Sequence, residues 1–89
     1  MHQNYPNPFN PETMLAYEVH RAGEVRLTIY NVLGQAVRTL VDGALQTPGA
    51  YTVVWNGMDD AGRPAASGLY FYTLHTGETV RTRVMTLLR

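Results

Sequence analysis

The sequence predicts an all-β fold, and three observations support that prediction. Apolar and polar residues alternate with a period of two over most of the chain, which is the spacing of half-buried strands. Turn signals rich in Gly, Pro, Asn and Asp recur about every ten residues. No segment shows an amphipathic helical repeat. Short, regularly spaced strands of this kind favour an antiparallel β-sandwich, with a small barrel as the alternative.

The first part of the chain holds three expected strands. Residues 14–19 alternate, with Leu, Tyr and Val on one face, and a turn at 20–23 ends them. Residues 25–30 alternate in the same way, with Val, Leu and Ile on one face. After a break at 33–35, residues 36–41 are expected to form a third strand because they are rich in β-branched side chains.

Three more strands are expected after the turn pairs Asp42–Gly43 and Pro48–Gly49. They are residues 51–55, 69–76 and 79–88. A polar loop rich in Gly and Asp, residues 56–68, separates the first two, and Gly77–Glu78 is short enough to join the last two as a hairpin. The pattern predicts six strands, with room for a seventh, in one domain.

Composition excludes several classes of function. The 89 residues have a net charge of zero, so the chain lacks the basic excess that nucleic acids or anionic membranes attract. No cysteine is present, which excludes disulfides, thiolate metal sites and cysteine nucleophiles. No apolar run is long enough to span a membrane, and residues 1–3 do not resemble a signal peptide. If the chain is exported, we expect it to be part of a longer protein or to use another route.

The last expected strand has apolar residues on both faces. Val80, Val84 and Leu88 fall on one face, and Met85 and Leu87 on the other. This predicts either that both faces are covered or that a β-bulge shifts the register. Arg81 and Arg83 share a face, which is one way to keep an edge strand from pairing with another molecule.

Catalytic and metal-binding patterns are weak. His2, His20 and His75 are far apart and lack ligand spacing, so we expect surface histidines. Ser67 lacks a nucleophile motif and is expected only to lead into a strand. We therefore predict that the chain is not an enzyme and holds no cofactor.

One loop offers oxygen ligands. Asn56, Asp59 and Asp60 could be imagined around a calcium ion, but their spacing is not that of an EF-hand loop. The favoured interpretation is turn chemistry, in which these side chains accept hydrogen bonds from nearby backbone N–H groups.

Aromatic residues are abundant enough to raise the question of carbohydrate binding. Alternation assigns Tyr17, Trp55, Tyr70 and Tyr72 to the core. Tyr30 and Phe71 fall on the opposite faces of their strands, so they are the rings expected to be exposed. An accessory carbohydrate-binding module is therefore one alternative function.

The opening segment cannot form a helix or an ordinary strand. It consists of Tyr5, Pro6, Asn7, Pro8, Phe9, Asn10 and Pro11. Because proline fixes φ and favours extended geometry in the residue before it, we predict a stiff connector over residues 1–11 that leads into a domain at 12–89. We expect Tyr5 or Phe9 to pack against the sandwich. Recognition of this proline-rich segment by another protein is the alternative.

Blocks along the whole of residues 5–89 resemble a known family. They are YPNPFNP at 5–11 with YEV at 17–19, VRLTIYNVLGQ at 25–35, GAYTVVWNG at 49–57, DDAGRP at 59–64, SGLYFY at 67–72 and RVMTLLR at 83–89. In this order and spacing they resemble the C-terminal sorting domains of type IX secretion cargo. The pattern is also similar to the Ig-like domain of flagellar hook-capping proteins, which lacks the opening segment and the basic ending.

The resemblance implies a seven-stranded Ig-like sandwich with a non-catalytic role. Such a domain is the last module of a larger secreted protein, such as a glycosidase or protease, on the outer surface of a Gram-negative bacterium. Its implied partners are an outer-membrane translocon, the surface attachment machinery and an upstream catalytic domain, and the isolated module is expected to be monomeric. A structural Ig-like spacer is a further alternative.

By resemblance, the recognised signal lies in the last strand. Carried over by position, it comprises Arg81, Arg83, Met85, Leu87, Leu88 and Arg89. The family commonly has a pair of basic residues before the methionine, whereas here the second position is Val84. Cationic recognition would therefore rest on Arg81, Arg83 and Arg89.

Overall fold

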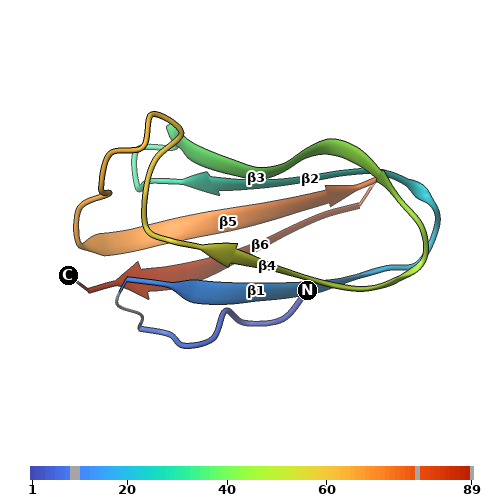
Figure 1. Ribbon diagram of the computed structural model, residues 1–89, viewed down its shortest axis with the longest axis horizontal. Helices are drawn as coiled ribbons and strands as arrows, with labels where there is room; N and C mark the ends of the chain where they lie inside the picture. Colours follow the sequence, from blue (N-terminus) through green and yellow to red (C-terminus); the bar gives the residue numbers. More distant parts are fainter. Residues whose placement is uncertain (9–10, 78, 89) are drawn as a thin grey trace.

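The computed structural model describes residues 1–8, 11–77 and 79–88, which form two antiparallel sheets and no helix (Figure 1). The strands are β1 (Thr13–Val19), β2 (Gly23–Tyr30), β3 (Ala36–Gln46), β4 (Gly49–Trp55), β5 (Gly68–Thr76) and β6 (Thr79–Leu87). One sheet pairs β1 with β4, and the other has the order β3-β2-β5-β6. The predicted sandwich is confirmed, with six strands in the described residues rather than seven.

The strand β3 is longer than expected because the predicted turn at Asp42–Gly43 is wrong. Val25 pairs with Ala44 and Arg26 pairs with Asp42, so Gly43 is an extra residue opposite β2. Its φ of 74° lies in the left-handed region, which glycine adopts without a steric cost. A β-bulge therefore replaces the turn, and one strand continues through it.

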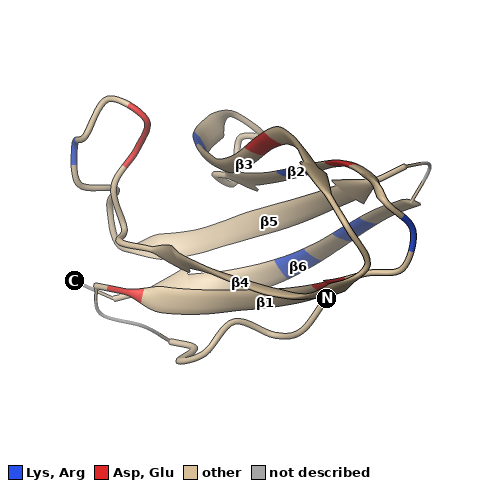
Figure 2. Ribbon diagram, turned by 45° about the vertical axis from the view of Figure 1, so that its right-hand side comes forward, with Lys and Arg blue, Asp and Glu red and all other residues tan. Residues whose placement is uncertain are grey.

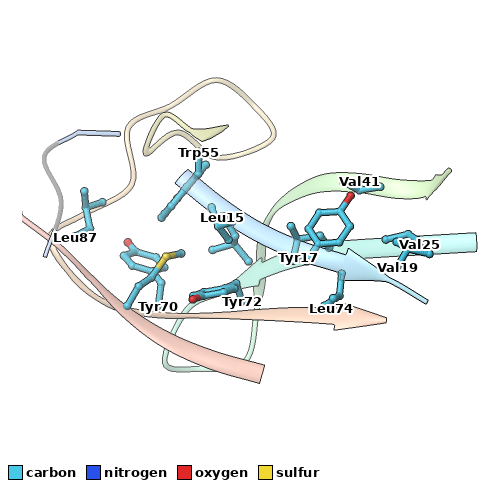
Figure 3. Packing of buried hydrophobic residues seen from close by; sticks show 13 residues of the cluster. Leu15, Tyr17, Val19, Val25, Val41, Trp55, Tyr70, Tyr72, Leu74 and Leu87 are labelled. Carbon is cyan, nitrogen blue, oxygen red and sulfur yellow. The ribbon is translucent and has the colours of Figure 1, made fainter. Parts of the chain in front are cut away.

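The core lies between the two sheets and contains the aromatic residues that alternation assigned to it (Figure 3). Its largest fully buried side chains are Trp55, Tyr17 and Tyr72. Trp55 meets Tyr70 edge to face at 5.3 Å between ring centroids, and Tyr17 stacks on the half-buried Tyr51 at 5.5 Å. Offset and edge-to-face contacts are the preferred geometries of aromatic pairs, so these rings both fill the core and orient one another.

The N-terminal segment, residues 1–8, is hydrogen-bonded to both sheets. On one side, Tyr5 exchanges backbone hydrogen bonds with Met14 of β1 at 2.8 and 2.9 Å. On the other side, the Tyr72 hydroxyl of β5 donates to the His2 carbonyl and accepts from the Asn4 N–H. The segment therefore closes the gap between the β1 and β6 sides of the sandwich. Division of the chain into a linker and a domain at residue 12 stays a prediction.

The expectation that the Tyr5 ring packs against the sandwich is wrong, because 74% of Tyr5 is exposed. Neighbouring residues of an extended segment point in opposite directions, and here it is Asn4 that points inward, with 2% exposed. The Asn4 side-chain amide donates to the Pro6 carbonyl and to the Thr13 hydroxyl. Phe9, the other candidate, lies outside the described residues.

Candidate recognition surface on the last strand

The strand β6 pairs with β5 in an unbroken register from Gly68–Leu87 to Thr76–Thr79. Neither alternative expected for its mixed faces is found in the described residues. There is no bulge between β5 and β6, and Val80, Val84 and Leu88 are exposed on the outer side rather than covered. Alternation places Arg81 and Arg83 on the inward side, together with Met85 and Leu87.

The predicted recognition residues divide into two groups. Met85 and Leu87 are 1% and 0% exposed, so their side chains cannot touch a partner while the domain is folded. Arg81, Arg83 and Leu88 are exposed, and Arg89 lies outside the described residues. A partner of the folded domain would therefore meet the arginines, while Met85 and Leu87 hold the strand in place.

Figure 2 marks the positions of the arginines and the acidic residues along the backbone, and three of the described arginines lie within 4.0 Å of an aspartate. Arg26 pairs with Asp42, Arg38 Nε lies 3.6 Å from Asp60 Oδ1, and Arg63 Nε lies 3.5 Å from Asp59 Oδ2.

Among the residues that the structure describes, Arg21, Arg81 and Arg83 have no carboxylate within 4.0 Å. Arg83 Nε donates instead to the Met1 carbonyl at 3.2 Å. The three arginines without a carboxylate lie on β6 and on the loop between β1 and β2.

A cavity of about 700 Å³ opens beside two of these arginines, Arg21 and Arg81. Arg81 contributes from β6 and Arg21 from the β1–β2 loop, while Leu74 and Met1 supply apolar surface. Arg21 was not foreseen, because it is sixty positions before Arg81 and only folding brings it to the same cavity. The sequence signals for this site were the family resemblance of the last strand and the alternation that places Arg81 on the same side as Met85.

The outer edge of β6 is partly covered by the N-terminal segment. Gln3 Nε2 donates to the Val84 carbonyl, and the Thr86 N–H donates to Asn7 Oδ1, both at 2.9 Å. The structure thus brings Asn7, expected in a connector, against the strand expected to carry the recognition signal. The Pro6 carbonyl accepts from Thr13 Oγ1, and Pro8 and Pro11 are exposed.

Tyr72 links the N-terminal segment to β5, beside Arg83 of β6. Burial raises the pKa of its hydroxyl, while its hydrogen bond with the Asn4 N–H and the positive charge of Arg83 oppose the increase. The neutral hydroxyl is therefore favoured, and in that form it both donates and accepts a hydrogen bond within the segment.

The loop after β4 uses its oxygen ligands for turn formation. Asp59 Oδ1 accepts from the N–H groups of Ala61 and Arg63 at 3.0 and 2.9 Å, and Asn56 Oδ1 accepts from the Met58 N–H. Asp60 Oδ1 accepts from the Thr39 N–H in β3. These bonds support the interpretation as turn chemistry, and no group of three potential metal ligands occurs in the described part of the chain.

The remaining candidates are dispersed. His2 Nε2 lies 2.9 Å from Glu18 Oε2, His20 is exposed and borders the cavity beside Arg21, and His75 is exposed on β5. Ser67 directly precedes β5, as expected. Tyr30 and Phe71 are opposite each other on the outer face of the larger sheet, with Phe71 37% exposed and Tyr30 half-buried. Residues 1–8, 11–77 and 79–88 include no helix that could cross a bilayer.

Comparison with known proteins gives one family match. A model of the FlgD Ig-like domain matches residues 12–79. FlgD from Xanthomonas campestris, described in connection with hook capping essential for flagellar assembly, is 23% identical with a TM-score of 0.61. The similarity covers 85% of this chain and 55% of that FlgD chain. A search of curated protein sequences found no significant match.

Two structures from Porphyromonas gingivalis share the fold over nearly the whole chain. PorZ, described as an essential bacterial surface component of the type IX secretion system, is 17% identical with a TM-score of 0.68, covering 98% of this chain and 11% of PorZ. Dimeric latent PorU is 15% identical with a TM-score of 0.73, covering 97% of this chain and 9% of PorU. The chain thus spans about a tenth of each protein. These matches support both resemblances drawn from the sequence.

Proposed function

The chain belongs to the FlgD Ig-like domain family, and from this premise we propose that it is a non-catalytic sorting and surface-attachment module of a larger secreted protein. In this proposal an outer-membrane translocon recognises the folded domain. Its location would be the outer surface of a Gram-negative bacterium, reached through the periplasm. A small Ig-like sandwich suits this role because a rigid scaffold presents its edges and loops to a partner without a catalytic site.

The observation that carries the proposal is the extent of the structural likeness. The family match ends at residues 12 and 79, and so omits the opening segment and most of β6. The likeness to PorZ extends over 98% of the chain and that to PorU over 97%, so it includes most of both ends. These ends are the parts by which sorting domains differ from hook-capping domains, and PorZ is described as a type IX secretion component.

Contacts in the molecule add support. The two ends meet, since Gln3 and Asn7 bond to β6 and Arg83 bonds to Met1. One exposed surface therefore combines the opening segment with the arginines of β6, which have no carboxylate within 4.0 Å in the described residues. A translocon that recognises a folded domain would contact such a composite surface, rather than a linear tail.

The test is export of a reporter. Residues 1–89 are fused behind a periplasmic reporter enzyme in a bacterium that has a type IX system, and protease accessibility on intact cells measures surface display. We expect display of the wild-type fusion and a clear loss for the Arg81→Ala/Arg83→Ala double variant, whereas Arg63→Ala serves as the matched control. Retention of a folded wild-type fusion in the periplasm would refute the proposal.

A second candidate function rests on the outer aromatic pair. Tyr30 and Phe71 lie side by side on the outer face of the larger sheet, where flat rings could stack on a sugar. Calorimetric titration with soluble polysaccharides tests this candidate, with Phe71→Ala as the variant that should abolish any heat. Flat titrations across several glycans would eliminate it.

A further inference from the structure

The strand β6 has a free edge in the larger sheet, and only part of that edge is covered. In the order β3-β2-β5-β6, no strand of the described chain pairs with the far side of β6. The Val84 carbonyl and the Thr86 N–H face that side, where Gln3 and Asn7 bond to them. Backbone groups alternate in direction along a strand, so those of Val80 and Thr82 face the same free edge.

The uncovered half of the edge carries a positive charge on its inward side. Arg81 and Arg83 are adjacent on that side, and Arg21 reaches the cavity that Arg81 lines. In the described residues none of the three has a carboxylate within 4.0 Å. Glu18 also borders the cavity, but its carboxylate lies 2.9 Å from His2 Nε2 and so is turned toward the N-terminal segment.

We propose that the open half of β6 binds an extended acidic peptide of a partner protein, which adds as a fifth strand beside Val80–Arg83. The inference rests on the proposed function and specifies the chemistry of the partner. The added strand takes its backbone hydrogen bonds from Val80 and Thr82. Carboxylates at every second position of the peptide then face Arg81 and Arg83, and one of them reaches the cavity toward Arg21.

Charge and geometry favour this occupant over a second copy of β6. Two β6 edges in antiparallel contact would place arginines opposite arginines, and like charges directly across a sheet are destabilising. A guanidinium binds a carboxylate through two parallel hydrogen bonds, which adds direction as well as attraction. The cavity of about 700 Å³ has room for more than one side chain beside the apolar surface of Leu74.

The test uses a peptide of alternating Thr and Glu, TETETET, with fluorescein on its N-terminus and an amide at its C-terminus, titrated against the 89-residue chain and followed by anisotropy. The matched probe replaces each Glu with Gln. We expect saturable binding of the acidic peptide that weakens with added salt, and about threefold to tenfold weaker binding for Arg81→Gln and for Arg21→Gln. Arg63→Gln, which removes a paired arginine on the β4–β5 loop, should bind as wild type does.

Hydrogen exchange tests the strand addition separately. The bound peptide should slow exchange of the Val80 and Thr82 amides and leave the Thr86 amide, already bonded to Asn7, unchanged. If the Gln peptide binds as tightly as the Glu peptide, or if Arg63→Gln weakens binding as much as Arg81→Gln does, recognition by charge is overturned. Binding without protection of Val80 and Thr82 would overturn the added strand.

The outcome is separable from that of the proposed function. A chain that displays the reporter on the surface but does not bind the acidic peptide refutes this inference and leaves the sorting role. A chain that binds the peptide but leaves the reporter in the periplasm refutes the sorting role and leaves this inference.

Discussion

The two halves of β6 alternate in the same way, but inward-pointing side chains are buried in one half and exposed in the other. In the C-terminal half, Met85 and Leu87 point inward and are fully buried. In the N-terminal half, Arg81 and Arg83 point to the same side and are exposed. The difference is one of cover, because Met85 and Leu87 belong to the core between the sheets, whereas Arg81 lines an open cavity and Arg83 donates to the Met1 carbonyl.

This contrast teaches that an inward position is not the same as a buried position. The smaller sheet has two strands and the larger sheet has four, so the smaller one cannot cover every inward side chain of the larger. Where cover is missing, an apolar inward residue would be exposed, and the sequence has arginine there instead. Three predictions probe this contrast, from the largest effect to the smallest.

The first prediction compares one inward residue from each half. Leu87→Ala should lower the free energy of unfolding by about 2–5 kcal/mol, because it leaves a cavity in the core. Arg81→Ala should change it by no more than about 0.5 kcal/mol, because the side chain is exposed and has no carboxylate partner in the described residues. Urea denaturation measures both. Similar losses in the two variants would show that the halves are equally packed.

The second prediction concerns a variant that loosens the N-terminal segment from the C-terminal half of β6. Asn4→Ala should lower the free energy of unfolding by about 1–3 kcal/mol, because the Thr13 hydroxyl loses a buried hydrogen bond and the Pro6 carbonyl loses a part-buried one. It should also speed exchange of the Thr86 amide, since the segment that holds Asn7 is loosened. Gln3→Ala is the control, because its bond to the Val84 carbonyl is exposed. If Asn4→Ala has no larger effect than the control, Asn4 does not hold the N-terminal segment in place.

The third prediction concerns how the free energy of unfolding depends on pH through Tyr72, which lies beside Arg83 where the two halves of β6 meet. Burial raises the pKa of Tyr72, so the neutral hydroxyl is favoured in the folded state. Below the ordinary tyrosine pKa of about 10 both states keep the proton and stability is complete. Above it the unfolded chain loses the proton first, so the free energy of unfolding falls as pH rises.

The Arg83 charge moderates this fall, because it lowers the pKa of Tyr72. Arg83→Gln should therefore raise that pKa further and steepen the alkaline loss of stability, whereas Tyr72→Phe should reduce the loss. Denaturation midpoints from about pH 9 to about pH 12 measure both effects, with Arg63→Gln as the control. An unchanged profile in Arg83→Gln would show that its charge does not reach Tyr72.

Much of the fold followed from local patterns. Alternation identified the core aromatic residues, including Trp55 and Tyr72, because a strand directs successive side chains to opposite faces wherever it lies. The Asp42–Gly43 pair shows the limit of such patterns. A glycine with positive φ suits both a turn and a bulge, and only the pairing of β2 with β3 on both sides of Gly43 makes it a bulge.

The candidate site was predicted only in part. Resemblance pointed to the last strand, and alternation placed Arg81 and Arg83 on one side of it. Neither could show that Met85 and Leu87 are withdrawn into the core while the arginines remain exposed. Arg21 and Asn7 were out of reach altogether, because their contacts with this region join positions about sixty and eighty residues apart in the chain.

The sequence by itself determined where most of the strands lie, which side chains can form a core and to which family the chain is similar. These are properties of neighbouring residues, set by side-chain direction, backbone propensity and turn chemistry. The tertiary structure decided where the opening segment lies, which half of β6 is covered and which arginines remain without a carboxylate partner in the described residues. Those outcomes depend on which distant segments meet. The alternation of side chains along a strand is a local property and does not reveal which segment packs against either face.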